Sequence, residues 1–314
     1  MNSERAGTGD VGLTLELLAI AVGCAGMGLA TVGTSVRWID RNYRRAEGLR
    51  IVLAVAGFVL VISGVLCLAV PGRAHVSTPF AQVSALVLLG CGLAAPILQR
   101  RPQVSLRPRR VLAIGAHPDD LELACGATLA KLVDGGGQVC TVVLSRGASG
   151  GDPSLRTREA ARAADYLGAM ASQVLDFCDT ELESQENEMV QALERVIKEF
   201  RPDIVLTHSA NDFHQDHAAV HRATMRAARR QPSILCYESP SATPSFAPVF
   251  YTDVSAYMDV KAHAIQLHAD QSGKPYMGAD RARGVAAFRG HQARLTLAEG
   301  FEVMRLDAAS VGDL

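Results

Sequence analysis

Three long apolar runs occupy most of the first hundred residues, and no other feature limits the fold as strongly. They cover residues 15–36, 51–70 and 80–98. Each is close to the roughly 20 residues with which a helix crosses a hydrocarbon core of about 30 Å. Small residues recur in them, as in AVGCAGMGLATVG, and small residues let helix backbones approach closely in lipid. We expect a membrane anchor of about three transmembrane helices over residues 1–98, with a two-span or re-entrant arrangement of the third run as the alternative.

Basic residues alternate between the loops that separate these runs. One basic residue precedes the first run, five lie in the first loop, one lies in the second loop and five lie in residues 99–110. Cytoplasmic loops carry the excess of positive charge, so this alternation predicts an N-terminus outside and a cytoplasmic remainder. A cleaved signal peptide fits less well, because acidic residues accompany the single leading arginine and two more runs follow. We expect an integral protein of the cytoplasmic membrane.

The segment QRRPQVSLRPRR, residues 99–110, predicts a basic linker. Its two prolines interrupt a helix, and its five arginines suit anionic headgroups of membrane lipids. Seven scattered cysteines without CxxC spacing suit a reducing compartment. A formal net charge of −1 gives no whole-chain electrostatic argument for nucleic acid as a partner.

Beyond the linker, short apolar runs alternate with helical patterns. The runs 111–116, 138–145, 173–178 and 203–208 predict buried strands, and the segments 120–134, 154–168, 185–200 and 216–230 predict helices. Strands at 234–239, 249–254 and 301–306 and helices near 256–272 and 279–294 complete the pattern. Such alternation predicts an α/β fold with a Rossmann-like parallel sheet sandwiched by helices. We expect this domain to cover residues 111–306, with a tail at 307–314.

Polar side chains follow the first and the fourth predicted strand. In a doubly wound sheet these strands meet at the point where the strand order reverses, and ligands bind at their carboxyl ends. The topology should therefore bring together two segments about a hundred residues apart. The residues concerned are His117, Asp119 and Asp120 in the first segment, and His208, Asp212, His214, Asp216, His217 and His221 in the second.

These residue types suit a divalent metal better than a nucleotide. A dinucleotide site needs glycines at the first turn, whereas adjacent carboxylates would repel a pyrophosphate. Imidazole and carboxylate are typical ligands of catalytic zinc, and one further carboxylate would remain to handle protons. The simpler alternative is that Asp119 and Asp120 cap the helix that begins at 120. Capping accounts for one aspartate but not for the pair together with the histidines.

The chain resembles the PIG-L/LmbE family of metal-dependent de-N-acetylases. The segments that carry the resemblance are AHPDDLELACGATLA, SRGASGG, RTREAARAADYLG, HSANDFHQDHAAVHRATMRAAR and AEGFEVMRL, and they cover nearly all of residues 109–306. That family includes deacetylases of N-acetylglucosaminyl-phosphatidylinositol and of the mycothiol and bacillithiol pathways. The resemblance does not account for the apolar N-terminal segment.

The resemblance implies a role for each motif position. His117, Asp120 and His217 would bind zinc, for which ferrous iron or another divalent metal is the alternative. Asp119 would be the general base, and His214, with Asp216 beside it, would stabilise the oxyanion. Arg156 resembles the family's substrate-binding arginine, although a plain helical salt bridge explains it almost as well. Ala148 stands where members of the family commonly have glutamate.

The combined hypothesis is a membrane-anchored zinc hydrolase that removes acetyl from an N-acetylglucosamine-type amino sugar. The anchor favours a lipid-linked substrate, because tethering raises the effective concentration of groups held at the bilayer. Two other classes remain as alternatives. One is a catalytically idle metal-binding membrane scaffold. The other is a nucleotide-sugar binder, for which RGASGG at 146–151 is the candidate phosphate loop.

Overall fold

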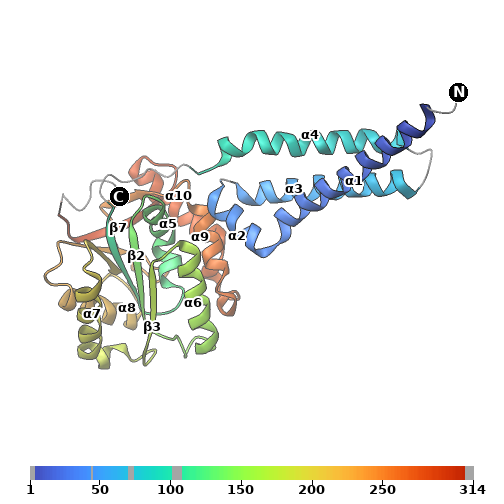
Figure 1. Cartoon of the computed structure of the whole chain (residues 1–314). Coiled ribbons are helices and arrows are strands. Elements are labelled where there is room, and N and C mark those ends of the chain that lie inside the picture. The colour runs from blue at the N-terminus through green and yellow to red at the C-terminus, as the bar shows by residue number, and fades with distance from the viewer. Residues whose placement is uncertain (1–3, 44, 70–73, 101–107, 308–314) are drawn as a thin grey trace. The chain divides into compact units, whose positions relative to one another are not determined.

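The computed structural model in Figure 1 describes residues 4–43, 45–69, 74–100 and 108–307. The chain divides into two compact units, residues 1–101 and 102–314. Most of the predicted linker, at 101–107, and nearly all of the predicted tail, at 308–314, lie outside the described residues.

Four helices make up the first unit: α1 (Glu4–Thr31), α2 (Gly33–Asn42), α3 (Ala46–Ala69) and α4 (Ala74–Leu98). By length and composition, α3 and the Pro79–Leu98 part of α4 could each cross a membrane. Among the described residues, a third membrane span is present only if the Leu17–Thr31 part of α1 and the whole of α2 form a single span. The two helices meet at an angle of 71°.

The bend explains why the run predicted at 15–36 is not one straight helix. It lies at Val32, whose backbone is extended (φ −73°, ψ 125°), and Gly33 follows as the first residue of α2. Thr31 Oγ1 donates to the carbonyl oxygen of Met27 at 2.7 Å. A hydroxyl that bonds back to the preceding turn competes with the helical ladder and often bends a helix.

Glycines allow α1 and α3 to pack closely. A Cβ atom added to Gly23 would lie 2.6 Å from the carbonyl oxygen of Gly57, and one added to Gly57 would lie 2.6 Å from that of Gly23. Real Cβ atoms do not approach oxygen this closely, so a larger side chain would push the helices apart. The expected role of small residues in helix contacts is confirmed at this pair.

A seven-stranded sheet forms the centre of the second unit, in the order β3-β2-β1-β4-β5-β7-β6. Its strands are β1 (Arg110–Gly115), β2 (Gln138–Ser145), β3 (Ala171–Phe177), β4 (Ile204–His208), β5 (Ser233–Tyr237), β6 (Phe250–Asp253) and β7 (Ala298–Arg305). The helices between them are α5 (Asp120–Asp134), α6 (Pro153–Leu167), α7 (Glu186–Phe200), α8 (Gln215–Ala227), α9 (Met258–Gln266) and α10 (Ala279–Ala293). Short 3₁₀ turns lie at η1 (Leu182–Gln185), η2 (Ala269–Gln271) and η3 (Pro275–Met277).

The first five strands are parallel, and β1 lies beside β4 as the strand pattern predicts. The prediction of a Rossmann-like parallel sheet is wrong at one strand. β7 runs antiparallel to both β5 and β6, so the sheet is mixed. The reason is that two helices, α9 and α10, connect β6 to β7. The first helix returns the chain to the end of the sheet where the parallel strands begin. The second helix carries it back to their carboxyl ends, so β7 must run in the opposite direction.

Helices cover both faces of this sheet (Figure 1). Successive residues of β1 point to opposite faces, so Val111 and Ala113 join one apolar cluster while Leu112 and Ile114 join the other. The first cluster includes residues of α5 and α9, and the second includes residues of α7 and α8. This two-sided burial explains why the strands read as continuous apolar runs.

A buried ion pair holds a kink in α5, the helix that begins at the predicted site. Cys125 has a non-helical backbone (φ −134°), which interrupts the helical ladder. Glu299 of β7 accepts hydrogen bonds from the backbone N–H groups of Ala127 and Thr128. Lys261 of α9 donates to the carbonyl oxygen of Ala124 and pairs with Glu299 at 2.6 Å. Loss of one partner would leave a buried charge uncompensated, at a cost of about 3–5 kcal/mol.

The glycine contact in the first unit yields a test of its packing. We expect Gly57→Ile to lower the thermal stability of the detergent-solubilised chain, because the new side chain would collide with the backbone of α1. Gly28→Ile is the matched control, since nothing lies within 4 Å of a Cβ at that position. Melting followed by size-exclusion chromatography of the two variants measures the difference. Equal melting temperatures would contradict the observed contact.

Candidate functional site

The predicted residues converge at the carboxyl ends of β1 and β4. The turn after β1 carries the first segment, and the loop between β4 and α8 carries the second. They line an open pocket of about 330 Å³ together with parts of four other loops. The polar lining residues are His117, Asp119, Asp120, Ser149, Arg156, Asp179, Thr180, His214, His217, Ser241, Lys274 and Tyr276.

Neither aspartate of the first segment acts as a helix cap. Asp120 Oδ2 accepts from the backbone N–H groups of Ala116 and His117, at 2.9 and 2.7 Å, and so closes the turn that precedes the helix. Asp119 stands at the N-cap position of α5, but its side chain makes no capping hydrogen bond. Its backbone is left-handed (φ 113°), a conformation that costs a non-glycine residue roughly 1–3 kcal/mol. The capping alternative therefore fails for both residues.

The two adjacent carboxylates differ in their electrostatic surroundings. Burial and the neighbouring charge of Asp120 raise the pKa of Asp119 to about 7. Burial acts in the same direction on Asp120, but the imidazoles of His217 and His208 outweigh it and hold the pKa of Asp120 well below its usual range. One carboxylate is thus held as the anion while the other can exchange a proton near neutral pH.

Asp212 orients His217. Asp212 Oδ2 lies 2.9 Å from His217 Nδ1, so in the neutral ring the proton is on Nδ1 and the lone pair is on Nε2. His217 Nε2 lies 3.4 Å from Asp120 Oδ1. Asp212 also accepts hydrogen bonds from Ser239 and Ser241 and from the backbone N–H of His214. A carboxylate behind the imidazole is the usual support of a metal-binding histidine.

Asp216 orients His117 in the same way. Its Oδ2 atom lies 3.0 Å from His117 Nε2, while its oxygens also accept from the backbone N–H groups of Thr180 and Leu182. His117 Nδ1 faces Asp120 Oδ2 at 3.6 Å. We expected Asp216 to lie beside His214, and its backbone N–H does donate to that ring. Its carboxylate, however, bonds to His117.

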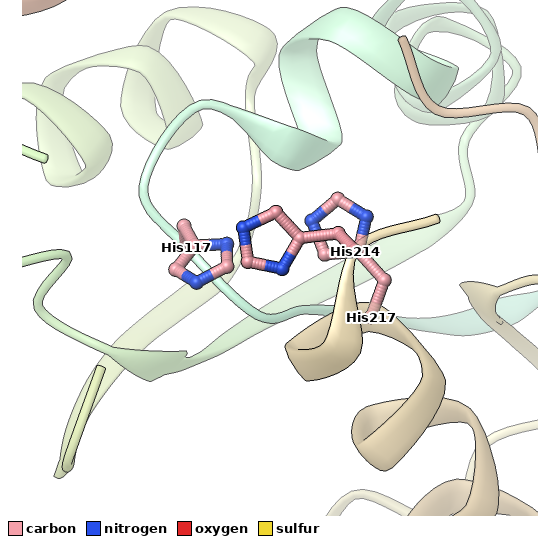
Figure 2. A group of neighbouring side chains, drawn as sticks. All are labelled: His117, His214 and His217. Carbon is pink, nitrogen blue, oxygen red and sulfur yellow. The ribbon is translucent and has the colours of Figure 1, made fainter. Parts of the chain in front are cut away.

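His214 presents a proton to the pocket. Its Nδ1 atom accepts from the backbone N–H of Asp216 at 3.3 Å, so in the neutral ring Nε2 carries the hydrogen. Burial, with the neighbouring charges of His217 and His117, lowers the pKa of His214 and favours that neutral form. Figure 2 shows its ring between the other two, with centroids 4.8 Å from that of His117 and 4.5 Å from that of His217. It can therefore donate a hydrogen bond to an oxygen in the pocket.

The donor atoms suit a divalent cation. Among the described residues, His117, His214 and His217 each offer a ligand atom within 4.8 Å of the others, as do Asp120, His208 and His217. A third such group is His117 with Asp179 and Asp216. The predicted set of His117, Asp120 and His217 is not itself one of these three groups. Its members are nevertheless neighbours, because Asp120 lies 3.6 Å from His117 Nδ1 through Oδ2 and 3.4 Å from His217 Nε2 through Oδ1. They combine two oriented imidazoles with an ionised carboxylate, which is the donor set of catalytic zinc sites.

Arg156 is buried and supports the turn after β1. Its guanidinium donates to the carbonyl oxygens of Gly147 and Pro118 and lies 3.4 Å from Asp119 Oδ2. Glu159, the acidic residue three positions later in α6, accepts instead from the backbone N–H of Asp270, so the structure gives Arg156 no helical salt bridge to it. A Cβ at Gly147, where φ is +66°, would lie 2.2 Å from the arginine Nη1. Gly147, the first glycine of the RGASGG segment, therefore makes room for Arg156. This packing accounts for the glycine without a bound phosphate.

His208 was placed in the second segment without a role as a ligand, and Asp179 was not predicted at all. His208 Nε2 lies 3.1 Å from Asp120 Oδ2. Asp179 follows β3, and its Oδ1 lies 3.1 Å from His117 Nε2. Its bond to His117 outweighs the effect of burial and lowers the pKa of Asp179 to about 2. The position of His208 at the end of a switch-point strand placed it near the site, whereas no motif marks Asp179.

Comparison with known proteins gives one family and a consistent fold. Residues 112–228 match the family model described as PIG-L, GlcNAc-PI de-N-acetylase. The uncharacterized deacetylase YaiS of Escherichia coli (strain K12) is 43% identical over 166 residues, which cover 50% of this chain and 89% of that protein. The diacetylchitobiose deacetylase of Thermococcus kodakarensis is 31% identical over 188 residues, covering 52% of this chain and 70% of that protein.

Solved structures agree with this match. The conserved protein TT1542 from Thermus thermophilus is 27% identical, with a TM-score of 0.56, over 66% of this chain and 97% of that chain. The N,N'-diacetylchitobiose deacetylase from Pyrococcus horikoshii, at 23% identity and a TM-score of 0.54, shares the fold over 62% of this chain and 84% of that chain. The family match includes every residue of the predicted site.

The support of His217 by Asp212 can be tested through metal affinity. We expect Asp212→Asn to weaken zinc binding by about 10-fold to 100-fold, because a neutral amide holds the imidazole less firmly. Competition with a chromophoric zinc chelator measures the change. Asp176→Asn is the matched control, since that aspartate is exposed and pairs with Arg146. Equal zinc affinity in the wild type and both variants would contradict the orienting role.

Proposed function

This chain belongs to the PIG-L/LmbE family of de-N-acetylases, and from that membership we propose that it hydrolyses the acetamide of an N-acetylglucosamine-type amino sugar. The observation that carries the proposal is the placement of Asp119. It lies in the pocket beside the candidate metal ligands, in a strained backbone conformation and without a capping bond. Strain that serves no local structural purpose is typical of catalytic positions.

In this proposal His117, Asp120 and His217 hold a divalent cation, for which zinc is our choice and ferrous iron accepts similar donors. The chemistry that such a cation supplies is Lewis acidity, which polarises the acetamide carbonyl and makes water more acidic. The ionised form of Asp120 and the orientation of the His217 ring by Asp212 support this assignment.

Asp119 would move the proton. A water molecule attacks the acetamide carbonyl carbon, and Asp119 takes one of its protons as the new C–O bond forms. The same carboxylic acid then gives that proton to the amine nitrogen as the C–N bond breaks, so that acetate and a free amino sugar result. A pKa raised to about 7 suits a group that must both accept and donate near neutral pH.

His214 would stabilise the developing oxyanion. The hydrogen bond from the Asp216 backbone N–H to Nδ1 favours a proton on Nε2, and that proton can reach an oxygen in the pocket. In acyl-transfer sites, a hydrogen-bond donor that is already in place before the reaction stabilises the transition state by about 2.7–4 kcal/mol. Arg156 would hold Asp119 and the turn before it, and because it lines the pocket it could also contact the sugar.

We propose further that the chain is anchored in the cytoplasmic membrane, with its α/β domain in the cytoplasm. Two described helices long and apolar enough to span, a bent pair that adds a third, and the alternation of basic loops support this. Such an anchor favours an amino sugar held at the bilayer by a lipid. An idle metal-binding scaffold remains the weaker alternative, because a scaffold has no need for the strained Asp119.

The general base is tested by Asp119→Asn. We expect the rate of acetate release from methyl N-acetylglucosaminide to fall by about 10²-fold to 10⁴-fold, because the amide cannot take a proton from water. Enzymatic quantification of acetate measures the rate, and metal analysis of the same preparation should show undiminished zinc. Asp165→Asn, in α6, is a control that leaves the pocket unchanged. Full activity in the Asp119 variant would remove the proposed base.

A further inference from the structure

Helix α2 contributes little length to a membrane span. It has 10 residues, which give it a length of about 15 Å. Because it is bent by 71° from the Leu17–Thr31 part of α1, it advances only about 5 Å along the direction of α1 (Figure 1). Spanning helices are tilted by about 20° on average, so a helix bent this sharply from a spanning neighbour runs close to the plane of the membrane.

Helix α1 is long enough to cross a membrane without α2. The Leu17–Thr31 part alone is too short, but the helix begins at Glu4 and has 28 residues, a length of about 42 Å. Residues 11–31 contain a single charged residue, Glu16, and extend over about 31 Å, which matches a hydrocarbon core of about 30 Å. The third span can therefore be α1 alone, which leaves α2 for another role.

Polar contacts hold α2 in its bent direction. Arg100, which follows α4, donates through Nη1 to the carbonyl oxygens of Asp40 and Arg41, each at 2.6 Å. Arg50 of α3 pairs with the carboxylate of Asp40 at 3.2 Å. Asp40 and Arg100 are both buried, so turning α2 into line with α1 would break polar contacts in a buried position. The contacts keep α2 at the end of the bundle where α3 begins and α4 ends.

The exposed face of α2 carries an aromatic residue beside a cation. Trp38, the only tryptophan of the chain, is 55% exposed, and Arg37 and Thr34 on the same face are exposed as well. Ile39, on the opposite face, is buried. Tryptophan is enriched where acyl chains meet headgroups, because its ring is apolar while its N–H seeks a polar partner. This face therefore suits the boundary layer of a bilayer.

Positive charge is in excess at this end of the bundle. The described arginines there are Arg37, Arg41, Arg45, Arg50 and Arg100, and the acidic residues are Asp40 and Glu47. Among the described residues, Arg37 forms no ion pair and no side-chain hydrogen bond, so its charge is available to a ligand. The complementary charge at the depth of a tryptophan belt is the phosphate of an anionic lipid.

From these contacts and charges we propose that α2 lies in the cytoplasmic headgroup layer and binds an anionic phospholipid there. The proposal rests on the proposed membrane anchor and adds to it a helix that lies on the bilayer instead of crossing it. Arg37 binds the lipid phosphate, because arginine forms charge-assisted hydrogen bonds with phosphate oxygens. The ring of Trp38 lies beside that phosphate, at the upper end of the acyl chains.

The fluorescence of Trp38 tests the lipid preference without an added label, because the chain has no other tryptophan. The full-length protein is reconstituted into vesicles of phosphatidylcholine and phosphatidylglycerol in which one of the two lipids carries bromine, a contact quencher. We expect the affinity for brominated phosphatidylglycerol to exceed that for brominated phosphatidylcholine about 3-fold to 5-fold, and to become about equal to it in Arg37→Gln. Arg195→Gln, at an exposed arginine of α7, is the matched control that should keep the preference.

Lipids brominated at different depths test the orientation of α2. The wild type is compared with the double variants Trp38→Phe/Thr34→Trp, on the same face of α2, and Trp38→Phe/Val22→Trp, in α1. For a helix in the membrane plane, tryptophan at positions 34 and 38 should differ in depth by about 2 Å, whereas a continuous span would separate them by about 6 Å. Tryptophan at position 22 should lie deepest and marks the hydrocarbon core.

Three results would overturn the proposal: a separation of about 6 Å between positions 34 and 38, equal quenching of the wild type by the two lipids, or a lipid preference that survives Arg37→Gln. Absence of quenching at all three tryptophan positions would also refute the membrane anchor. Arg37 is not part of the catalytic pocket, so acetate release should be unchanged in Arg37→Gln. Failure of the deacetylase function would therefore leave these fluorescence results unaffected.

Discussion

The parallel pairing of β1 with β4 is the constraint on which the site depends. It places the ends of two strands side by side although their residues are about a hundred positions apart in the chain. The turn after β1 and the loop after β4 then face one another, and each brings histidine and aspartate. Burial of β1 and β4 on both faces keeps this pairing fixed, because a shift in register would move their side chains to the wrong layer.

Carboxylates orient the imidazole rings of the cluster. Asp212 and Asp216 each hold one imidazole by one nitrogen and leave the other nitrogen directed at Asp120. Asp120 in turn is tied to the backbone of its own turn. Among these four acids, Asp119 has no such hydrogen bonds beyond the contact with Arg156. It is also the one whose pKa lies above its usual value, because no partner outweighs the effect of burial. In the function that we propose, this division separates a cation-binding acid from a proton-transferring acid at adjacent positions.

Much of this arrangement could be predicted from local signals. The HPDD and HxDH segments follow strands whose apolar runs are continuous, so the convergence of His117, Asp120 and His217 followed from topology alone. The direction of β7 was missed although two helices were predicted before it, at 256–272 and 279–294, because a strand that follows two helices instead of one runs in the opposite direction. Asp179 was missed because it comes from β3, two strands away from β1. The contact of Asp216 with His117 depends on side-chain direction at a helix start, which spacing does not encode.

The central claim is that two distant segments hold one cation together. Metal analysis of the purified full-length chain, with His117→Ala and His217→Ala compared with His291→Ala on α10, tests this most directly. The account predicts about one divalent ion per chain in the wild type and in the His291 variant, and loss of that ion in each of the other two. Retention of a full equivalent in either His117→Ala or His217→Ala would contradict it.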